Sequence, residues 1–181
     1  MSLRVPENEP LLERYFVAVG KALLIGSNFE EKCIHVMRIQ RIEEAIQKGD
    51  DPREAAGQWV EVNKTKLNNA IQKIESDPAT SDRQGEILHT ARKARNFVAH
   101  EAAAMGEVWE VADSDIYTRV VRLMDRVREM AEGENIVSAW TYEITEGDPA
   151  PASFAAGYVE QVLEWVFGDL REEATNAIHS N

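Results

Sequence analysis

The residue types that could carry chemistry gather in one short stretch, residues 95–100, which reads Arg-Asn-Phe-Val-Ala-His. An arginine carries a permanent positive charge that can hold a phosphate group, and a histidine can exchange a proton near neutral pH. The sequence shows no signature of a serine, threonine or cysteine nucleophile, no glycine-rich phosphate loop and no set of metal-ligand spacings. We therefore place any catalytic role first at Arg95, Asn96 and His100, and we expect neither a metal nor another cofactor.

The pattern around this stretch predicts a helix with two different faces. Apolar side chains recur on one side, at Ile87, Ala91, Ala94 and Val98. Since an α-helix turns by about 100° per residue, the opposite side carries a polar stripe: His89, Arg92, Asn96 and His100. On a straight helix Arg95 lies about 140° from His100. The two groups meet at one phosphate only if the helix bends, if the long arginine chain wraps around, or if two subunits each lend residues.

Such a groove suits cleavage of an RNA phosphodiester without a metal. The ribose 2′-hydroxyl is then the nucleophile, so the protein need not supply one. His100 would accept its proton or protonate the leaving oxygen. Arg95 would stabilise charge on the phosphoryl oxygens, and Asn96 would orient the imidazole or contact the phosphate.

Three more side chains of the same helix are candidate RNA contacts: His89, Arg92 and Lys93. Residues 83–95 hold four basic side chains against one acidic side chain, a local charge of +3 that would attract a phosphate backbone. The alternative is that this is an ordinary surface helix without a site, because any such helix has a polar stripe opposite an apolar face. Arg92 and Lys93 would then simply be solvated, and His100 would pack or cap.

Residues 95–100 resemble the Arg-(x)4–6-His motif of HEPN domains, the higher-eukaryote and prokaryote nucleotide-binding superfamily. Asparagine directly after the arginine is one of the polar residues that this family favours. The resemblance implies a helical bundle and a metal-independent endoribonuclease, often the effector of a toxin–antitoxin or phage-defence system. It also implies Arg95 and His100 as the catalytic pair, Asn96 as the supporting residue, and a homodimer in which two motifs face one cleft. An antitoxin or other protein partner is part of the same expectation.

The elements that position this stretch are helical almost throughout. Apolar spacings of three and four predict helices over residues 9–26, about 28–49, 52–75, from 82 into the motif, 114–133 and from 153 to about 173. Ser27 or Asn28 looks like an N-cap, with Glu30 and Glu31 as favourable first-turn charges. Residues 9–49 could equally form one long, kinked helix. The chain is thus predicted to be all-α, an up-and-down bundle of five to seven helices within a single domain, residues 1–181.

Two segments do not read as plain helix. Residues 134–151 mix aromatic and β-branched side chains with a Gly-Asp-Pro-Ala-Pro loop, and we predict an irregular connector or an extended arm there, with a short helix over residues 135–145 as the alternative. Residues 174–181 are polar and are predicted to fray.

Composition bounds the function class. The chain has 181 residues, is 44% hydrophobic and carries a net charge of -12. The charge is uneven, because residues 1–100 hold 15 basic and 15 acidic side chains, whereas residues 101–181 hold 5 and 17. Such acidity argues against a general nucleic-acid coat protein. A second hypothesis is therefore a catalytically silent helical module that binds a nucleotide, or a basic partner through the acidic second half.

The sequence also bears on location. The N-terminus has no apolar signal region, and no apolar run approaches the roughly 18 residues that a bilayer span needs. The single cysteine, Cys33, excludes an intrachain disulfide and reads as a small buried apolar residue. We expect a cytoplasmic protein without a membrane partner.

Overall fold

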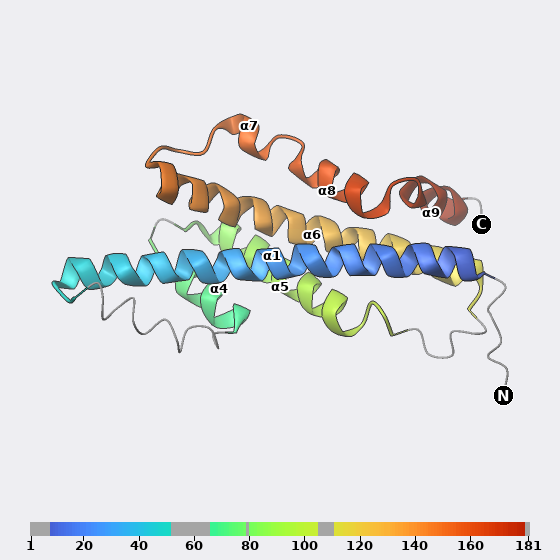
Figure 1. Ribbon diagram of the computed structural model, residues 1–181, viewed down its shortest axis with the longest axis horizontal. Coiled ribbons are helices and arrows are strands. Elements are labelled where there is room, and N and C mark those ends of the chain that lie inside the picture. The colour runs from blue at the N-terminus through green and yellow to red at the C-terminus, as the bar shows by residue number, and fades with distance from the viewer. Residues whose placement is uncertain (1–7, 52–65, 79, 105–110, 180–181) are drawn as a thin grey trace.

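The structure, a computed structural model, describes residues 8–51, 66–78, 80–104 and 111–179. Within these ranges all regular secondary structure is helical (Figure 1). The helices are α1 (Glu9–Lys48), α4 (Leu67–Glu75), α5 (Asp82–His100), α6 (Asp113–Glu146), α7 (Ala152–Ala155), α8 (Tyr158–Phe167) and α9 (Leu170–His179). The predicted all-α class is confirmed. Part of the predicted helix over residues 52–75 lies outside the described residues, and α4 is its observed end.

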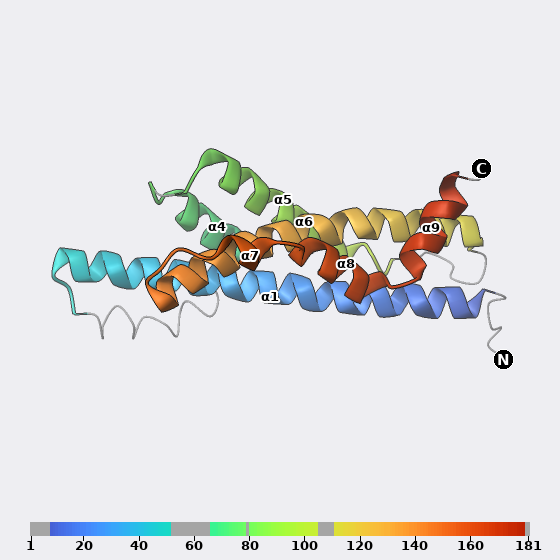
Figure 2. The ribbon, with the colours of Figure 1, turned by 90° about the horizontal axis from the view of Figure 1, so that it is seen from above.

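The helices form an up-and-down bundle around two long, roughly parallel rods, α1 and α6 (Figures 1 and 2). α5 runs in the opposite direction and packs against both. The segment from α7 to α9 also returns in that direction, and it packs mainly on α6. The motif helix α5 is therefore held by two long helices that extend beyond it.

α1 is one helix of 40 residues rather than two. It begins after Asn8, with a proline in its first turn, and it ends at Gly49, whose φ of 78° is the left-handed conformation that favours glycine. Ser27, the predicted cap, instead lies inside the helix, where its hydroxyl donates to the carbonyl of Leu23 at 2.9 Å. At 1.5 Å per residue the helix is about 60 Å long.

The structure corrects the prediction of an irregular arm over residues 134–151. α6 continues as helix through this segment to Glu146, and only residues 147–151 form a connector. Packing decides the outcome, because Glu134 and Val137 are buried. Thr141 turns its hydroxyl back onto the Val137 carbonyl at 2.8 Å, so the threonine is accommodated within the helix.

The predicted frayed tail is also corrected, since residues 174–179 belong to α9. Ala174 is fully buried against the bundle. Arg14 of α1 donates to both carboxylate oxygens of Glu173 at 2.8 and 3.0 Å, and this pair ties α9 to α1. The segment thus has both an apolar anchor and a charged anchor.

The buried side chains form two clusters, one toward each end of the bundle. The larger cluster joins the first half of α1 and the end of α5 to α8 and α9 through α6. The smaller cluster joins the second half of α1 to α4 and the start of α5. α1, α5 and α6 contribute to both clusters, so the same three helices carry the whole core. In the described ranges no helix combines the length and apolar character needed to cross a bilayer.

Candidate functional site

α5 presents the motif because its two faces are well defined. Ser81 caps the helix, with its backbone N–H donating to the Gln84 side chain at 2.9 Å in a reciprocal capping box. The buried face consists of Gly85, Leu88, Ala91, Ala94 and Val98. Ile87, predicted to be buried, is only half-buried. The other sides of α5 border the neighbouring helices and solvent. Polar side chains there are accessible to a ligand.

Arg95 does not point freely to solvent. Its guanidinium forms an ion pair with Glu30 of α1, and the two side chains are 29% and 25% exposed. The stem of Arg95 crosses α1 at Gly26, where an added Cβ would lie 3.1 Å from the Arg95 Cγ. A side chain at residue 26 would thus crowd the arginine. The absence of one at Gly26 lets the guanidinium reach Glu30.

Asn96 and His100 stand on the outer side of α5. Both side chains are exposed, and His100 is the last residue of the helix. The Arg95 Nη1 atom lies 3.5 Å from the Asn96 Oδ1 atom, a long contact that links the guanidinium to the stripe. His100 lies one helical turn beyond Asn96 on the same side. Asn96 and His100 therefore lie on one side of α5, whereas Arg95 lies about 140° from His100 and is bound to α1.

The three predicted RNA contacts differ in their surroundings. His89 is held by Glu75 of α4, with its Nε2 atom 2.9 Å from the nearer carboxylate oxygen. Arg92 is half-buried, and its Nε atom is buried without a hydrogen-bond partner in the described structure. Lys93 is exposed. Lys93 is therefore readily available to an RNA backbone, whereas His89 would first have to leave its carboxylate.

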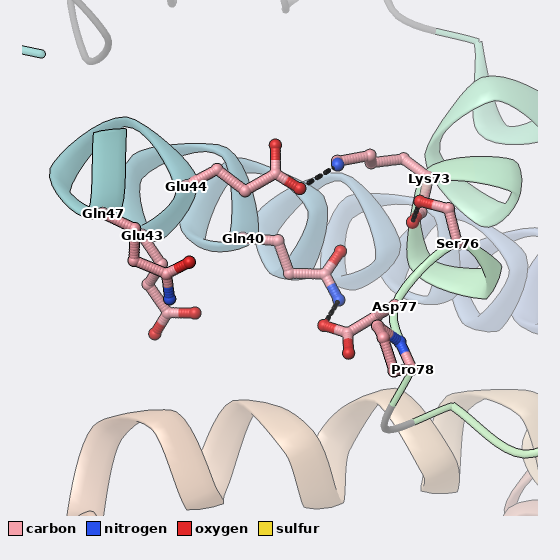
Figure 3. A pocket seen from close by; sticks show the side chains of 8 residues that line it. All are labelled: Gln40, Glu43, Glu44, Gln47, Lys73, Ser76, Asp77 and Pro78. Carbon is pink, nitrogen blue, oxygen red and sulfur yellow. Dashed lines mark hydrogen bonds and ion pairs between the residues drawn. The ribbon is translucent and has the colours of Figure 1, made fainter. Parts of the chain in front are cut away.

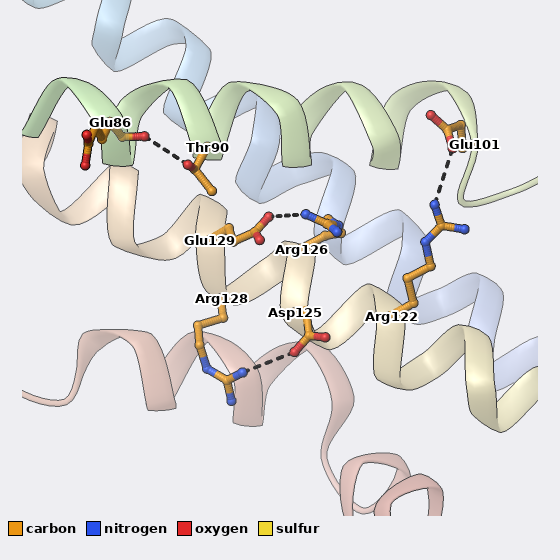
Figure 4. A network of polar contacts seen from close by, with 8 residues as sticks. All are labelled: Glu86, Thr90, Glu101, Arg122, Asp125, Arg126, Arg128 and Glu129. Atoms are coloured by element: carbon orange, nitrogen blue, oxygen red, sulfur yellow. Dashed lines mark hydrogen bonds and ion pairs between the residues drawn. The ribbon is translucent and has the colours of Figure 1, made fainter. Parts of the chain in front are cut away.

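A row of arginines on α6 lies beside the motif and was not predicted as part of the site (Figure 4). The Arg122 guanidinium is 4.4 Å from the centre of the Phe97 ring, and that of Arg126 is 5.9 Å away. Arg122 also lies 3.7 Å from Glu101, and Arg119 donates to the Ala104 carbonyl at 3.1 Å. The sequence signal was available, because residues 119, 122 and 126 are spaced by three and four and so share a helix face.

These arginines change the electrostatic picture of the acidic half. Residues 101–181 contain only five basic side chains, and four of them lie on α6 between residues 119 and 128. Arg126 pairs with Glu129 at 2.6 Å and Arg128 with Asp125 at 3.4 Å, both on α6 itself. Three of these arginines, Arg119, Arg122 and Arg126, share the face of α6 that lies beside α5, whereas Arg128 is directed to the opposite side (Figure 4).

A second candidate site is a groove that begins between the C-terminal half of α1 and the end of α4 (Figure 3) and continues to α6. It consists of two adjacent cavities of about 240 and 140 Å³, which share Gln40, Glu43 and Asp77. Its other charged side chains are Glu44, Lys73 and Glu143. Lys73 is paired with Glu44, and the Gln40 amide donates to Asp77 at 3.0 Å. Val36, Trp140 and Ile144 provide an apolar wall. The lining is therefore acidic with one aromatic side chain.

A buried charge lies between α1 and α6 near the middle of the bundle. Glu134 is 2% exposed, and one of its carboxylate oxygens accepts a hydrogen bond from Lys32 at 2.8 Å. Lys32 also donates to Ser138 at 2.9 Å. Burial, and then the nearby Glu134 carboxylate, raise the pKa of Tyr158. Burial also raises the pKa of the Cys33 thiol, with smaller contributions from Glu30 and Glu134. Cys33 is accordingly an inert thiol, as expected.

No protein-family model, curated protein or solved structure matches the chain. Within the described ranges no group of three or more histidine, cysteine, aspartate or glutamate side chains could hold a metal ion. The two candidate sites of the described structure are thus the exposed side of α5 and the acidic groove.

Proposed function

We propose that the protein is a metal-independent endoribonuclease that acts through Arg95, Asn96 and His100. The supporting observation is the exposed side of α5 on which His100 follows Asn96 by one turn, with the Arg95 guanidinium 3.5 Å from the Asn96 side-chain oxygen at its border. We further propose that it works as a homodimer and serves as the effector of a toxin–antitoxin or phage-defence system. These two points follow from the resemblance to HEPN domains.

The chemistry follows from the groups present. The ribose 2′-oxygen attacks phosphorus, the bond from phosphorus to the 5′-oxygen breaks, and the products are a 2′,3′-cyclic phosphate and a 5′-hydroxyl. His100 takes the proton of the 2′-hydroxyl, and a second proton reaches the leaving oxygen, for which the partner subunit's His100 is suited. Arg95 stabilises the negative charge on the phosphoryl oxygens once RNA displaces Glu30 from part of its guanidinium.

Arginines of α6 contribute binding rather than chemistry in this proposal. Arg119 and Arg122 lie beside the end of α5, and the Arg122 side chain is 60% exposed. Guanidinium groups in a row bind successive phosphates without reading the base sequence. They would compensate for the overall acidity, which otherwise repels RNA.

The decisive experiment incubates single-stranded and structured RNA with the protein in EDTA. His100→Ala is expected to abolish cleavage, whereas His179→Ala, which changes an exposed histidine of α9, is expected to retain it. An RNA with 2′-deoxyribose at the cleaved position should be inert. Equal cleavage by the wild type and His100→Ala, or no cleavage by either on any RNA, would contradict the proposal.

A second candidate function, a silent interaction module for a basic partner, is supported by the acidic groove, of which Figure 3 shows the part between α1 and α4. Carboxylates beside Trp140 suit an arginine side chain, which can pair with acids and stack on an aromatic ring. Titration with an arginine-rich peptide, followed by tryptophan fluorescence, separates the two functions. Glu143→Gln should weaken binding and Glu132→Gln, an exposed residue elsewhere on α6, should not. If the protein is such a module, neither the wild type nor Arg95→Ala cleaves RNA, and the substitution changes only stability or binding.

A further inference from the structure

α1 carries an apolar face that no described element covers. Of the large apolar side chains that are exposed, four lie within nine residues of α1: Phe16, Val17, Leu23 and Leu24, at 38%, 52%, 41% and 52%. Together with Gly20 they occupy about 120° of the helix surface. We call these five residues the α1 stripe. α1 lies along one edge of the bundle, which leaves this face outward (Figure 2).

The α1 stripe extends onto α8 through Trp165. This side chain is 46% exposed, and Lys21 lies over its ring at 5.3 Å while donating to its backbone carbonyl at 2.7 Å. On the scale of 150–250 Å² for a whole aromatic side chain, the exposed parts of the stripe and Trp165 amount to roughly 400 Å². An apolar patch of that size on a monomer commonly marks an interaction site.

No contact within the described monomer explains why residue 20 is a glycine. It lies in the middle of α1, where glycine is less favourable than alanine. A Cβ built on it would meet nothing within 4 Å, in contrast to Gly26 and Gly133, whose neighbours leave no such room. The missing side chain is explained if another backbone approaches α1 closely at this point.

We propose that the α1 stripe is the docking surface for a second copy of this chain, with the two α1 helices antiparallel and crossing at Gly20. A two-fold axis at Gly20 sets residue 16 against residue 24 and residue 17 against residue 23 of the partner. Phe16 then meets Leu24, and Val17 meets Leu23, so each large side chain finds an apolar side chain opposite. The stripe is complementary to itself.

Charge favours a second copy over a different partner. The chain has 32 acidic side chains, yet residues 15–28 contain none and only one basic residue, Lys21. Two strongly acidic molecules can therefore meet here without opposing carboxylates. The antiparallel arrangement also sets Glu13 against Ser27 of the partner, whereas a parallel pair would set Glu13 against itself.

Area is consistent with a dimer core. A stable interface covers about 800 Å² on each partner, and its apolar core is surrounded by a polar rim. The stripe and Trp165 would supply the core. Polar residues beside it on α1, such as Ser27 and Asn28, are exposed and available for the rim.

The mass of the protein in solution tests the proposal. Analytical ultracentrifugation from about 1 to 100 µM should show a dimer for the wild type. Leu24→Glu should weaken association at least tenfold. Ile46→Glu is the matched control, because it makes the same change at a 55% exposed position of the same helix and should leave the dimer intact. A monomeric wild type, or a dimer equally sensitive to both changes or to neither, overturns the proposal.

Two further variants test the geometry. Gly20→Gln adds bulk without charge, and it should raise the thermal stability of the monomer while weakening association at least tenfold. The double variant Phe16→Cys with Leu24→Cys should form a disulfide-linked dimer under mild oxidation. Leu24→Cys alone should not, because the two copies would be about 12 Å apart along the axis. Efficient linkage through Leu24→Cys alone would show a parallel pair and overturn the arrangement.

This inference rests on the homodimer of the proposed function and assigns its contact to a face of α1 that is separate from the end of α5 that carries His100. Its tests measure mass and cross-linking and need no RNA. A dimeric wild type that cleaves no RNA would contradict the nuclease, and a monomeric wild type that cleaves RNA would contradict the docking surface.

Discussion

Two ion pairs on opposite sides of α1 differ in one property, burial. Glu30 pairs with Arg95 of α5, and both side chains keep about a quarter of their surface exposed. Lys32, two residues later, pairs with Glu134 of α6, whose side chain is 3% exposed. One Glu134 oxygen, Oε2, is buried without a hydrogen-bond partner in the described structure. Both members of the first pair thus reach solvent, whereas in the second only Lys32, 38% exposed, does so and the carboxylate is buried.

The comparison separates a group that can take part in function from one that fixes the fold. An exposed pair contributes little to stability, because solvent screens it and both partners remain hydrated if it breaks. A buried carboxylate that loses its partner retains an uncompensated charge in a medium that solvates it poorly. Arg95 can therefore exchange Glu30 for a phosphate at small cost, while Glu134 has to keep Lys32.

The largest expected effect comes from Lys32, the partner of the buried carboxylate. Lys32→Ala should lower the free energy of unfolding by about 3 kcal/mol, because Glu134 is left charged and buried without its cation. Urea denaturation followed by circular dichroism measures the change. Lys32→Met combined with Glu134→Met should recover most of the loss. Lys93→Ala, an exposed lysine of α5, is the control and should cost less than about 0.5 kcal/mol. Similar losses for both single variants would refute the distinction.

Cys33 reports on the buried side of α1. Its thiol is fully buried with a pKa above its usual value, mainly through burial. Alkylation by iodoacetamide at pH 8 should be at least about 100-fold slower in the native protein than in urea, because the thiol must first be uncovered and ionised. Mass spectrometry follows the reaction. Lys32→Ala should accelerate it, and Glu30→Ala should not. Rapid alkylation of the native wild type would show that this side of α1 opens readily.

Truncation of the open pair should have a smaller effect. Glu30→Ala is expected to lower the free energy of unfolding by less than about 1 kcal/mol, because both partners keep about a quarter of their side-chain surface in contact with solvent. The same substitution should increase affinity for single-stranded RNA, since it releases the Arg95 charge. Urea denaturation and fluorescence anisotropy give the two values. A loss as large as that of Lys32→Ala would place the Arg95 pair with the fold instead.

The smallest effect belongs to an exposed pair at the end of the bundle. The Arg14 guanidinium, by hydrogen bonding, holds the pKa of Glu173 below its usual value of 4.5. A depressed carboxyl pKa stabilises the folded state above the unfolded pKa, and this contribution is lost as the pH falls through the folded pKa. Wild type and Arg14→Ala should thus differ by a few tenths of a kcal/mol at pH 7, and by nothing near pH 2. A difference that grew toward low pH would contradict this assignment.

The sequence predicted the motif helix well, because a polar stripe opposite Ala91, Ala94 and Val98 needs only helical periodicity. It did not predict the partner of Arg95. Glu30 was interpreted as a first-turn charge because Ser27 resembled a cap. In the structure the Ser27 hydroxyl donates to a carbonyl of α1 itself. Glu30 pairs with Arg95 of α5, whose side chain passes over Gly26. Such contacts depend on which helices become neighbours, and local spacing does not encode that.

Residues 134–146 show the same limit at the level of the fold. Their aromatic and β-branched side chains lower helix propensity, and the sequence alone left a short helix and an extended arm as alternatives. Val137 is fully buried within the smaller core cluster, and Trp140 packs against it. Tertiary packing of this kind outweighs propensity differences of a few tenths of a kcal/mol per residue. The Arg122–Phe97 contact was missed for a different reason, because it joins two separate helices, α5 and α6, and spacing within one helix does not show which side chains of the next one it meets.

The unbroken length of α1 has a consequence for how the molecule comes apart. A single rod of 40 residues takes part in both core clusters, as do α5 and α6. Unfolding of one end would disorder the same three helices that form the core at the other end. Neither half of the bundle therefore has a separate set of helices that could stay folded alone. Heating should accordingly yield one sigmoidal transition, with near- and far-ultraviolet signals lost together rather than in stages.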